Sequence, residues 1–223
     1  VNGKKFKDLK PPKDYYFFFK NLFNGYRFDA IAGALQRYTE FLLTRWINNL
    51  VNAKETKNLC LAGGVAMNVK ANLEISKLNK ISQIYVPPSP DDSSQSMGAC
   101  YAYCLINNLS TKPLVNAYLG YEIDDVKAAI AIKKLPLSKY KIYKKDITKF
   151  TTKLLLKDKI IGICRGRAEF GARSLGNRSI ICSPKNLENV KKINETVKNR
   201  DFWMPFAASV VDKYAKKYFN LKK

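Results

Sequence analysis

The stretch Arg165–Ser179 reads Arg-Gly-Arg-Ala-Glu-Phe-Gly-Ala-Arg-Ser-Leu-Gly-Asn-Arg-Ser and directly follows a short apolar run, Lys159–Cys164. A short β-branched run of this kind is typical of a buried strand. In the stretch, arginines alternate with glycines: Arg165, Gly166, Arg167, Gly171, Arg173, Gly176 and Arg178. Glycine allows positive φ and close backbone approach, and the guanidinium fork matches phosphate or carboxylate in two-point contact. The stretch therefore suits a cradle for a small anion, with an ordinary basic loop as an equal alternative.

The composition is that of a folded, basic protein. The 223 residues are 46% hydrophobic and 12% aromatic, which argues against disorder and allows one large or two modest domains. The balance of 40 Lys and Arg against 18 Asp and Glu gives a formal charge of +22. This charge favours anionic partners such as nucleotides, phosphates and nucleic acid, although scattered lysine more often forms a solvated surface.

Several classes of chemistry are excluded because the sequence contains no histidine. Ser-His and Cys-His nucleophile pairs and a His-based metal triad cannot come from this chain. Five cysteines form no Cys-x-x-Cys pair, so buried free thiols in a reducing cytoplasm are expected: Cys60, Cys100, Cys104, Cys164 and Cys182. No run reaches the ~18 apolar residues that span a bilayer. We expect a cytoplasmic protein and, because it begins at Val1, a piece of a longer one.

The first half of the sequence predicts alternating helices and strands. The expected elements are a helix over 29–51, strands at 58–62 and 83–86, and helices over 65–78 and from Ser93 or Ser94 to Ile106. The first helix has Asp29 as its cap and an apolar stripe at a 3.6-residue period, made of Ile31, Leu35, Tyr38, Leu42, Trp46 and Leu50. This order implies parallel strands with helical crossovers, and ligands at the carboxyl ends of the strands.

The pattern restarts after a linker expected at 107–113. The second half predicts helices over 124–132, 146–156 and 183–198, and strands at 139–144, 159–164 and 179–182. Ser183 and Pro184 are typical of an N-cap and a first helical position. The inward-facing side of the helix that they open would be apolar, with Leu187, Val190, Ile193 and Val197. Residues 1–27 indicate irregular structure.

Two segments fall at predicted carboxyl ends of strands. The Gly63-Gly64 turn opens a helix, so its backbone N–H groups could bind a nucleotide phosphate while Asn68 reaches a ribose or base; a tight turn without ligand is the alternative. Asp91 and Asp92 follow the other strand. We interpret Asp91 as a helix cap and place Asp92 near a metal or nucleotide.

A third segment, Arg200–Phe206, mixes a cation with aromatics. Trp203 and Phe206 are interpreted as core or interface residues, because nucleic-acid readers usually show several exposed aromatics among positive charges. Lys198 and Arg200 would add positive charge to the anion cradle.

Four motifs in the same order, over residues about 28–212, resemble those of the O-carbamoyltransferases that act on nodulation factors and antibiotics. They are Leu59-Cys-Leu-Ala-Gly-Gly-Val-Ala-Met-Asn68, Pro90-Asp-Asp-Ser-Ser-Gln-Ser-Met-Gly-Ala99, the stretch Gly166–Ile180, and Asn194-Glu-Thr-Val-Lys-Asn-Arg200 followed by Pro205-Phe-Ala. Met204 stands where the family carries an arginine, and Ala172 where it carries a proline.

The resemblance implies a role for each motif. It implies ATP binding at Gly63, Gly64 and Asn68, and iron or another divalent cation at Asp92. It implies carbamoyl phosphate binding at Arg165, Glu169, Gly171, Gly176, Asn177, Ser179, Lys198 and Arg200, and catalytic roles for Arg167, Arg173 and Arg178. In the family, carbamoyl phosphate and ATP give carbamoyl-adenylate, and the carbamoyl group then passes to a hydroxyl of a sugar or antibiotic.

The implied fold is α/β: the C-terminal half of an actin-like (RNase H-like) ATPase domain over 1–112, and the N-terminal part of a YrdC-like domain over 113–223. The chain would be a fragment, inactive alone, and its missing N-terminal half would carry two iron-binding histidines. The sequence is compatible with a homodimer but does not require one. The alternatives are a relative of threonylcarbamoyl-tRNA synthesis, against which the Gly-Arg-x-Glu-x-Gly-x-Arg pattern speaks, and a basic nucleic-acid-binding module, for which no known motif is present.

Overall fold

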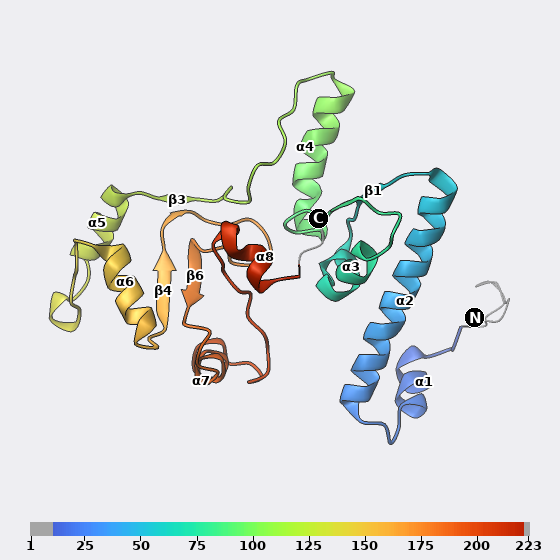
Figure 1. Ribbon diagram of the computed structural model, residues 1–223, viewed down its shortest axis with the longest axis horizontal. Coiled ribbons are helices and arrows are strands. Elements are labelled where there is room, and N and C mark those ends of the chain that lie inside the picture. Colours follow the sequence, from blue (N-terminus) through green and yellow to red (C-terminus); the bar gives the residue numbers. More distant parts are fainter. Residues whose placement is uncertain (1–10, 221–223) are drawn as a thin grey trace. The chain divides into compact units, whose positions relative to one another are not determined.

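The computed structural model describes residues 11–220, which Figure 1 shows coloured along the sequence. They form two compact units. The first comprises the described residues up to Cys60 together with Asn68–Tyr85, and the second comprises Leu61–Met67 and the described residues from Val86 onward. The Gly63-Gly64 turn and the Asp91-Asp92 pair therefore belong to the second unit, whereas Asn68 belongs to the first. The domain boundary between residues 112 and 113 stays a prediction.

The first unit combines three helices with a parallel strand pair. Its elements are α1 (Tyr15–Leu22), α2 (Phe28–Lys54), β1 (Asn58–Cys60), α3 (Val69–Ser76) and β2 (Gln83–Tyr85). The predicted parallel pairing is confirmed, with Asn58 opposite Gln83. The expectation of irregular structure at 1–27 is wrong for α1, where Asp14 caps the helix by accepting from the N–H of Phe17 at 3.0 Å. Residues 1–10 lie outside the described residues.

The core of the first unit lies between α2 and α3, which pack together (Figure 1). Ile47 and Val51 of α2 and Ala71 and Ile75 of α3 are buried there. At about 1.5–3 kcal/mol for each fully buried large aliphatic side chain, these residues supply the main apolar stabilisation of the pair.

The buried face of α2 is not the stripe that the periodicity predicts. Leu35 and Trp46 are 65% and 56% exposed, whereas Ile47 is 1% exposed. The helix is apolar on more than one face, and α3 covers the face that carries Ile47. Among residues 11–220 the predicted stripe stays largely exposed, including Tyr38, Leu42 and Leu50. Asp29 also lies within the first turn of α2, after an Arg27 N-cap position, and is not itself the cap.

The second unit consists of short helices and two antiparallel strand pairs. Its elements are η2 (Gly64–Met67), η3 (Asp92–Ser94), α4 (Gln95–Ile106), β3 (Glu122–Ile123), α5 (Asp125–Lys133), η4 (Leu137–Lys139), α6 (Ile147–Leu156), β4 (Ile161–Cys164), β5 (Gly166–Arg167), β6 (Arg178–Ile181), α7 (Glu188–Lys192), the π-helix η5 (Ile193–Lys198), η6 (Asp212–Tyr214) and α8 (Ala215–Tyr218). The predicted helices at α4, α5 and α6 and the strands at β4 and β6 are confirmed.

Other expectations for this unit are wrong. The strand predicted at 139–144 does not form: Lys139 ends η4, and residues 140–144 meet no partner strand among the described residues. The helix predicted over 183–198 begins only at α7 and changes to π geometry at Ile193. Ile193 is buried as predicted, but Leu187 is 79% exposed.

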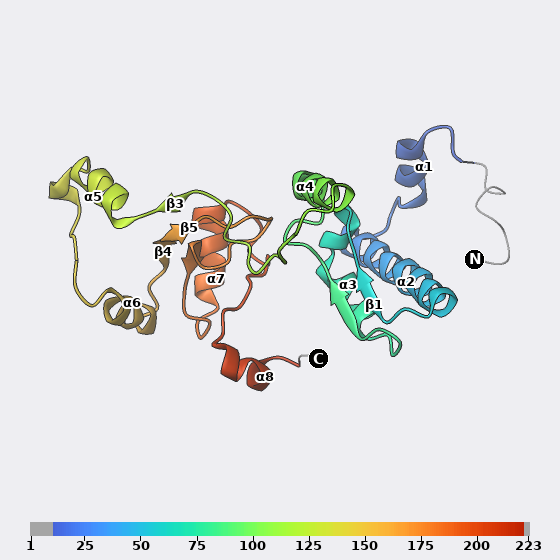
Figure 2. The ribbon, with the colours of Figure 1, turned by 90° about the horizontal axis from the view of Figure 1, so that it is seen from above.

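The structure is a mixture of helices and two-stranded sheets of α/β-like character. Within residues 11–220 there are three such sheets; β3 and β5 lie together in Figure 2. In the same range, no helix is long and apolar enough to cross a bilayer. All five cysteines are free thiols as expected, but they are exposed or half-buried, not buried.

Candidate anion-binding site

The arginine stretch is the connection between two paired strands. β4 and β6 are antiparallel, with Cys164 opposite Arg178 and Ile163 opposite Ser179 (Figure 1). β5 pairs with β3, which places Arg167 opposite Glu122. Because both ends of the connection are held by strands, residues 168–177 form a loop anchored at its two ends.

Glu169 is the centre of this loop. Its Oε1 accepts hydrogen bonds from three backbone N–H groups, those of Leu175, Asn177 and Arg178, at 2.9, 2.7 and 3.0 Å. These three hydrogen bonds, of which the one from the Arg178 N–H has the largest effect, lower the pKa of Glu169 to about 2. Gly176 makes the turn possible because its φ is +104°, a conformation that side chains disfavour. The carboxylate therefore folds the C-terminal part of the loop.

Three of the four arginines donate hydrogen bonds to other groups of the protein. Arg178 donates to the carbonyl oxygens of Arg165 and Gly166. Arg167 donates to the carbonyls of Gly120 and Leu119 at 3.2 and 3.3 Å. Arg165 Nε donates to Oδ1 of Asn177 at 3.3 Å, and the Asn177 amide donates to the Arg167 carbonyl at 2.8 Å. The side chains predicted to bind an anion at these positions thus also hold the backbone.

Arg173 differs from the other three. It is exposed and has no hydrogen bond or ion pair with any residue in the described range 11–220. It lies between Gly171 and Gly176, both at positive φ. A guanidinium that is carried on an anchored loop and satisfied by no neighbour is free to bind an external anion.

The loop packs against the segment that carries the acidic pair. A Cβ on Gly171 would lie 2.6 Å from the carbonyl oxygen of Pro88, so only glycine fits this approach. Two residues further on, the Pro90 carbonyl accepts a hydrogen bond from the N–H of Gly63 at 2.7 Å. The structure therefore brings together three motifs that are far apart in the sequence: the Gly63-Gly64 turn, the Pro88–Asp92 segment and the arginine stretch.

The glycine turn itself is open. A Cβ at Gly63 or Gly64 would meet nothing within 4 Å, and Gly63 has a φ of +99°. The Gly63 N–H is committed to Pro90 and is not available to a phosphate. Gly64 begins η2, which ends at Met67 before Asn68 caps α3.

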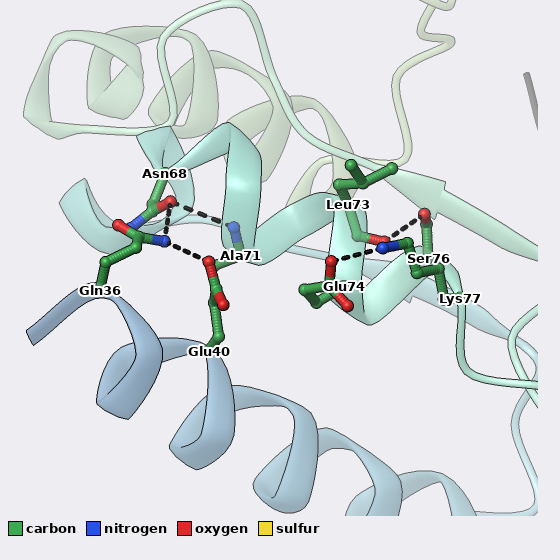
Figure 3. Close-up of polar contacts among 8 residues, drawn as sticks. All are labelled: Gln36, Glu40, Asn68, Ala71, Leu73, Glu74, Ser76 and Lys77. Carbon is green, nitrogen blue, oxygen red and sulfur yellow. Dashed lines mark hydrogen bonds and ion pairs between the residues drawn. The ribbon is translucent and has the colours of Figure 1, made fainter. Parts of the chain in front are cut away.

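Both polar atoms of the Asn68 side chain have hydrogen-bond partners within the protein. Its Oδ1 accepts from the N–H of Ala71 at 3.1 Å and from Nε2 of Gln36 at 3.1 Å, and its Nδ2 donates to Oε1 of Gln36 at 2.9 Å (Figure 3). Gln36 also donates to Glu40 at 2.7 Å. Asn68 therefore caps α3 and joins it to α2, and its predicted contact with ATP stays a prediction that this pairing does not favour.

Replacing Asn68 by alanine is expected to destabilise the first unit by about 1.5 kcal/mol, because the cap of α3 and the paired amides are lost together. Asn68→Asp keeps the capping oxygen and removes only the donor to Gln36, so its loss should be smaller. Urea unfolding followed by circular dichroism measures both. Equal stability of Asn68→Ala and the unchanged chain would contradict the structural role.

Asp91 is a cap and Asp92 does not complete a metal site. Asp91 Oδ1 accepts hydrogen bonds from the hydroxyl of Ser89 at 2.7 Å and from the N–H of Ser93 at 3.1 Å, which confirms the predicted cap. The hydrogen bond from Ser89 has the largest effect on the Asp91 carboxyl and, with those from Ser93, lowers its pKa. Asp92 accepts from Gln95 at 3.1 Å. Between residues 11 and 220 no three His, Cys, Asp or Glu side chains are grouped to hold a metal. These residues do not fit a metal by themselves, and iron at Asp92 stays a prediction.

The segment after η5 is held by Asn194, the first residue of the fourth motif, for which no role was predicted. Asn194 is fully buried and donates to the carbonyls of Phe202 and Met204, both at 2.9 Å, while its Oδ1 accepts from Arg200 Nε at 2.7 Å. A polar residue on a predicted apolar helix face was the available signal. Arg200 also lies over the Phe206 ring, 4.7 Å from its centre, so it is a structural residue as well as a predicted ligand.

Other side chains of that segment are more exposed than predicted. Trp203 is 59% and Phe206 39% exposed, so Trp203 is not a core residue within the described chain. Lys198 is exposed, and its ammonium group has no hydrogen bond or ion pair with any residue from 11 to 220. Lys198 and Arg173 are therefore the predicted ligands whose charged groups are free of protein partners in that range.

The depressed pKa of Glu169 predicts a pH dependence of stability. Its pKa of about 2 lies below the ordinary 4.5, so its contribution is complete above pH 4.5 and is lost as the pH falls towards 2. The difference in free energy of unfolding between the unchanged chain and Glu169→Gln should shrink over this interval. Urea unfolding at a series of pH values measures it. A difference that grows on acidification would contradict the three N–H bonds.

Comparison with known proteins identifies the family. Residues 13–101 match the family model described as carbamoyltransferase N-terminus, and residues 152–223 match carbamoyltransferase C-terminus. Together the two models cover more than half of the chain. The chain belongs to the carbamoyltransferase family.

Its relatives include bacterial nodulation proteins. Nodulation protein NolO of Bradyrhizobium diazoefficiens is 29% identical over 201 residues, which are 86% of this chain and 35% of that protein. Nodulation protein U of Rhizobium tropici is 28% identical over 164 residues, 74% of this chain and 27% of the relative. An uncharacterised protein of Methanocaldococcus jannaschii is 36% identical over 186 residues, 81% of this chain and 35% of the relative. The chain thus spans about a third of the length of these relatives.

Proposed function

We propose that this chain is part of an ATP-dependent O-carbamoyltransferase in which the arginine stretch binds carbamoyl phosphate. The observation that carries the proposal is Arg173, a free guanidinium on a loop anchored by Glu169 and by the β4–β6 pair. Bidentate contact to a phosphate is what such a group offers. Membership of the carbamoyltransferase family supports a carbamoyl-bearing phosphate as the anion that binds at this site.

The proposed reaction passes through carbamoyl-adenylate. Water releases phosphate from carbamoyl phosphate, and the resulting carbamate oxygen attacks the α-phosphorus of ATP with loss of pyrophosphate. A hydroxyl of a sugar or natural product then attacks the carbamoyl carbon, AMP leaves, and the hydroxyl proton passes to solvent. Guanidinium groups at the site would stabilise charge on the phosphate oxygens. The nucleotide would lie at the open Gly63-Gly64 turn. The Gly63–Pro90 hydrogen bond holds this turn against the Pro88–Asp92 segment, which belongs to the same unit as the arginine stretch.

The proposed architecture places half of an actin-like ATPase domain before part of a YrdC-like domain. The parallel β1–β2 pair with its following helices supports the first, and the match of residues 152–223 to the C-terminal family model supports the second. The exposed stripe of α2 supports a further partner, the remainder of the family sequence, since large apolar surfaces mark interaction sites. That remainder would also have to supply further metal ligands beside Asp92.

Isothermal titration of the chain with carbamoyl phosphate near 0.15 M salt tests the proposal. Saturable binding with a stoichiometry of one is expected, and inorganic phosphate and a DNA duplex serve as comparison ligands. Because the chain carries a charge of +22, the duplex tests the nucleic-acid alternative, in which affinity falls steeply with salt. Salt-sensitive binding of duplex without any binding of carbamoyl phosphate would overturn the assignment.

A further inference from the structure

We propose that Glu169 is the positioning residue of the anion site: it does not touch the ligand but folds residues 175–178 so that Arg173 is presented to it. This inference rests on the proposed function, in which Arg173 binds carbamoyl phosphate. One carboxylate oxygen, Oε1, accepts hydrogen bonds from three backbone N–H groups within residues 175–178. Such convergence fixes the backbone directions of Leu175, Asn177 and Arg178 at once.

A direct contact of Glu169 with the ligand is disfavoured by charge. Carbamoyl phosphate is a dianion near neutral pH, and the Glu169 carboxylate is ionised there because its pKa is about 2. Two like charges in contact repel each other. The backbone N–H groups of Leu175, Asn177 and Arg178 are already bonded to Oε1 and are not available to a phosphate oxygen. The anion must therefore be bound by groups other than Glu169 and its three donors.

The rest of the loop depends on the same fold. Gly171 lies against Pro88 at one end, and the Gly176 N–H donates to the Ser179 hydroxyl at 2.8 Å at the other. Arg173 lies between these two fixed points. Without the carboxylate, residues 175–178 around the second fixed point lose three charge-assisted hydrogen bonds. Ordering Arg173 on binding then costs conformational entropy that the folded loop has already lost.

The experiment compares four chains: unchanged, Glu169→Ala, Glu169→Gln and the control Glu188→Ala, whose carboxylate lies at the start of α7. Carbamoyl phosphate binding is measured by titration, and trypsin cleavage after Arg173 is followed by mass spectrometry. Glu169→Ala should weaken binding at least tenfold and accelerate cleavage after Arg173. Glu169→Gln retains an acceptor of the same reach and should restore most of both, and Glu188→Ala should change neither.

The two readouts separate this inference from the proposed function. If the unchanged chain does not bind carbamoyl phosphate but Glu169→Ala is cut faster after Arg173, the proposed function fails and the positioning of the loop stands. Unchanged cleavage in Glu169→Ala, with circular dichroism like that of the parent, overturns the positioning role. Tighter binding by Glu169→Ala also overturns it, because the carboxylate would then occupy the place of the anion.

Discussion

Replacing Gly171 by alanine is expected to destabilise the second unit by about 3 kcal/mol and to abolish carbamoyl phosphate binding. Two causes add. The φ of +116° is strained for any residue with a Cβ, and that Cβ would lie 2.6 Å from the Pro88 carbonyl oxygen, where backbone and not a flexible side chain would have to move. The loop would have to leave the Pro88 segment, and Arg173, two residues on, would move with it.

Two other glycines separate these causes. Gly176 has a φ of +104°, but its Cβ would come no nearer than 3.9 Å to the Arg165 guanidinium. Gly162 in β4 has neither positive φ nor a neighbour within 4 Å. Gly176→Ala should therefore lose about 1–2 kcal/mol from strain alone, and Gly162→Ala should be within about 1 kcal/mol of the parent.

Urea unfolding and titration of the three variants form one series. If Gly171→Ala were no less stable than Gly176→Ala, the close approach to Pro88 would not exist in solution. The juxtaposition of the arginine stretch with the Pro88–Asp92 segment would then have to be abandoned.

Local signals in the sequence were sufficient for much of the fold. Asp91, predicted to cap a helix, accepts a hydrogen bond from the N–H of Ser93 at 3.1 Å. The strand–turn–helix order around residues 58–86 predicted the parallel pairing that β1 and β2 show. Both depend on interactions between residues that are near in sequence or on a general rule of chain connection.

The failures concern choices made by distant parts of the chain. α2 has two faces that periodicity alone cannot rank, and contact with α3 buries Ile47 instead of Trp46. Residues 139–144 alternate like a strand but find no partner in the described part of the chain. A strand needs a neighbour to satisfy its backbone, so the pattern was insufficient.

The candidate site shows the same division. The composition of the arginine stretch predicted an anion cradle, but not which groups are free to bind. That Arg178 bonds to carbonyls and Glu169 to N–H groups depends on the pairing of β4 with β6 and on the turn at Gly176. These long-range constraints assign the arginines to different tasks, although the sequence presents them as equivalent.

Arg173→Ala and Arg178→Ala should therefore fail in opposite ways. Removing Arg173 takes away a charged donor that no residue in the range 11–220 uses, so carbamoyl phosphate affinity should fall ten- to a hundredfold, in line with about 1.5–3 kcal/mol for a hydrogen bond to a charged group, while the free energy of unfolding changes by less than about 0.5 kcal/mol. Removing Arg178 deprives the Arg165 and Gly166 carbonyls of their donor, and should lower stability by about 2 kcal/mol.

Titration calorimetry and urea unfolding on the same preparations give both numbers for each variant. Lysine at either position sharpens the comparison, because it keeps the charge and loses the fork. Arg173→Lys should keep part of the affinity, since a point charge still attracts a dianion. Arg178→Lys should stay unstable, since one ammonium does not reach both carbonyls. If Arg178→Ala were as stable as the parent and lost binding like Arg173→Ala, Arg178 would be a ligand, and the division of the arginines into one binding residue and three structural ones would be wrong.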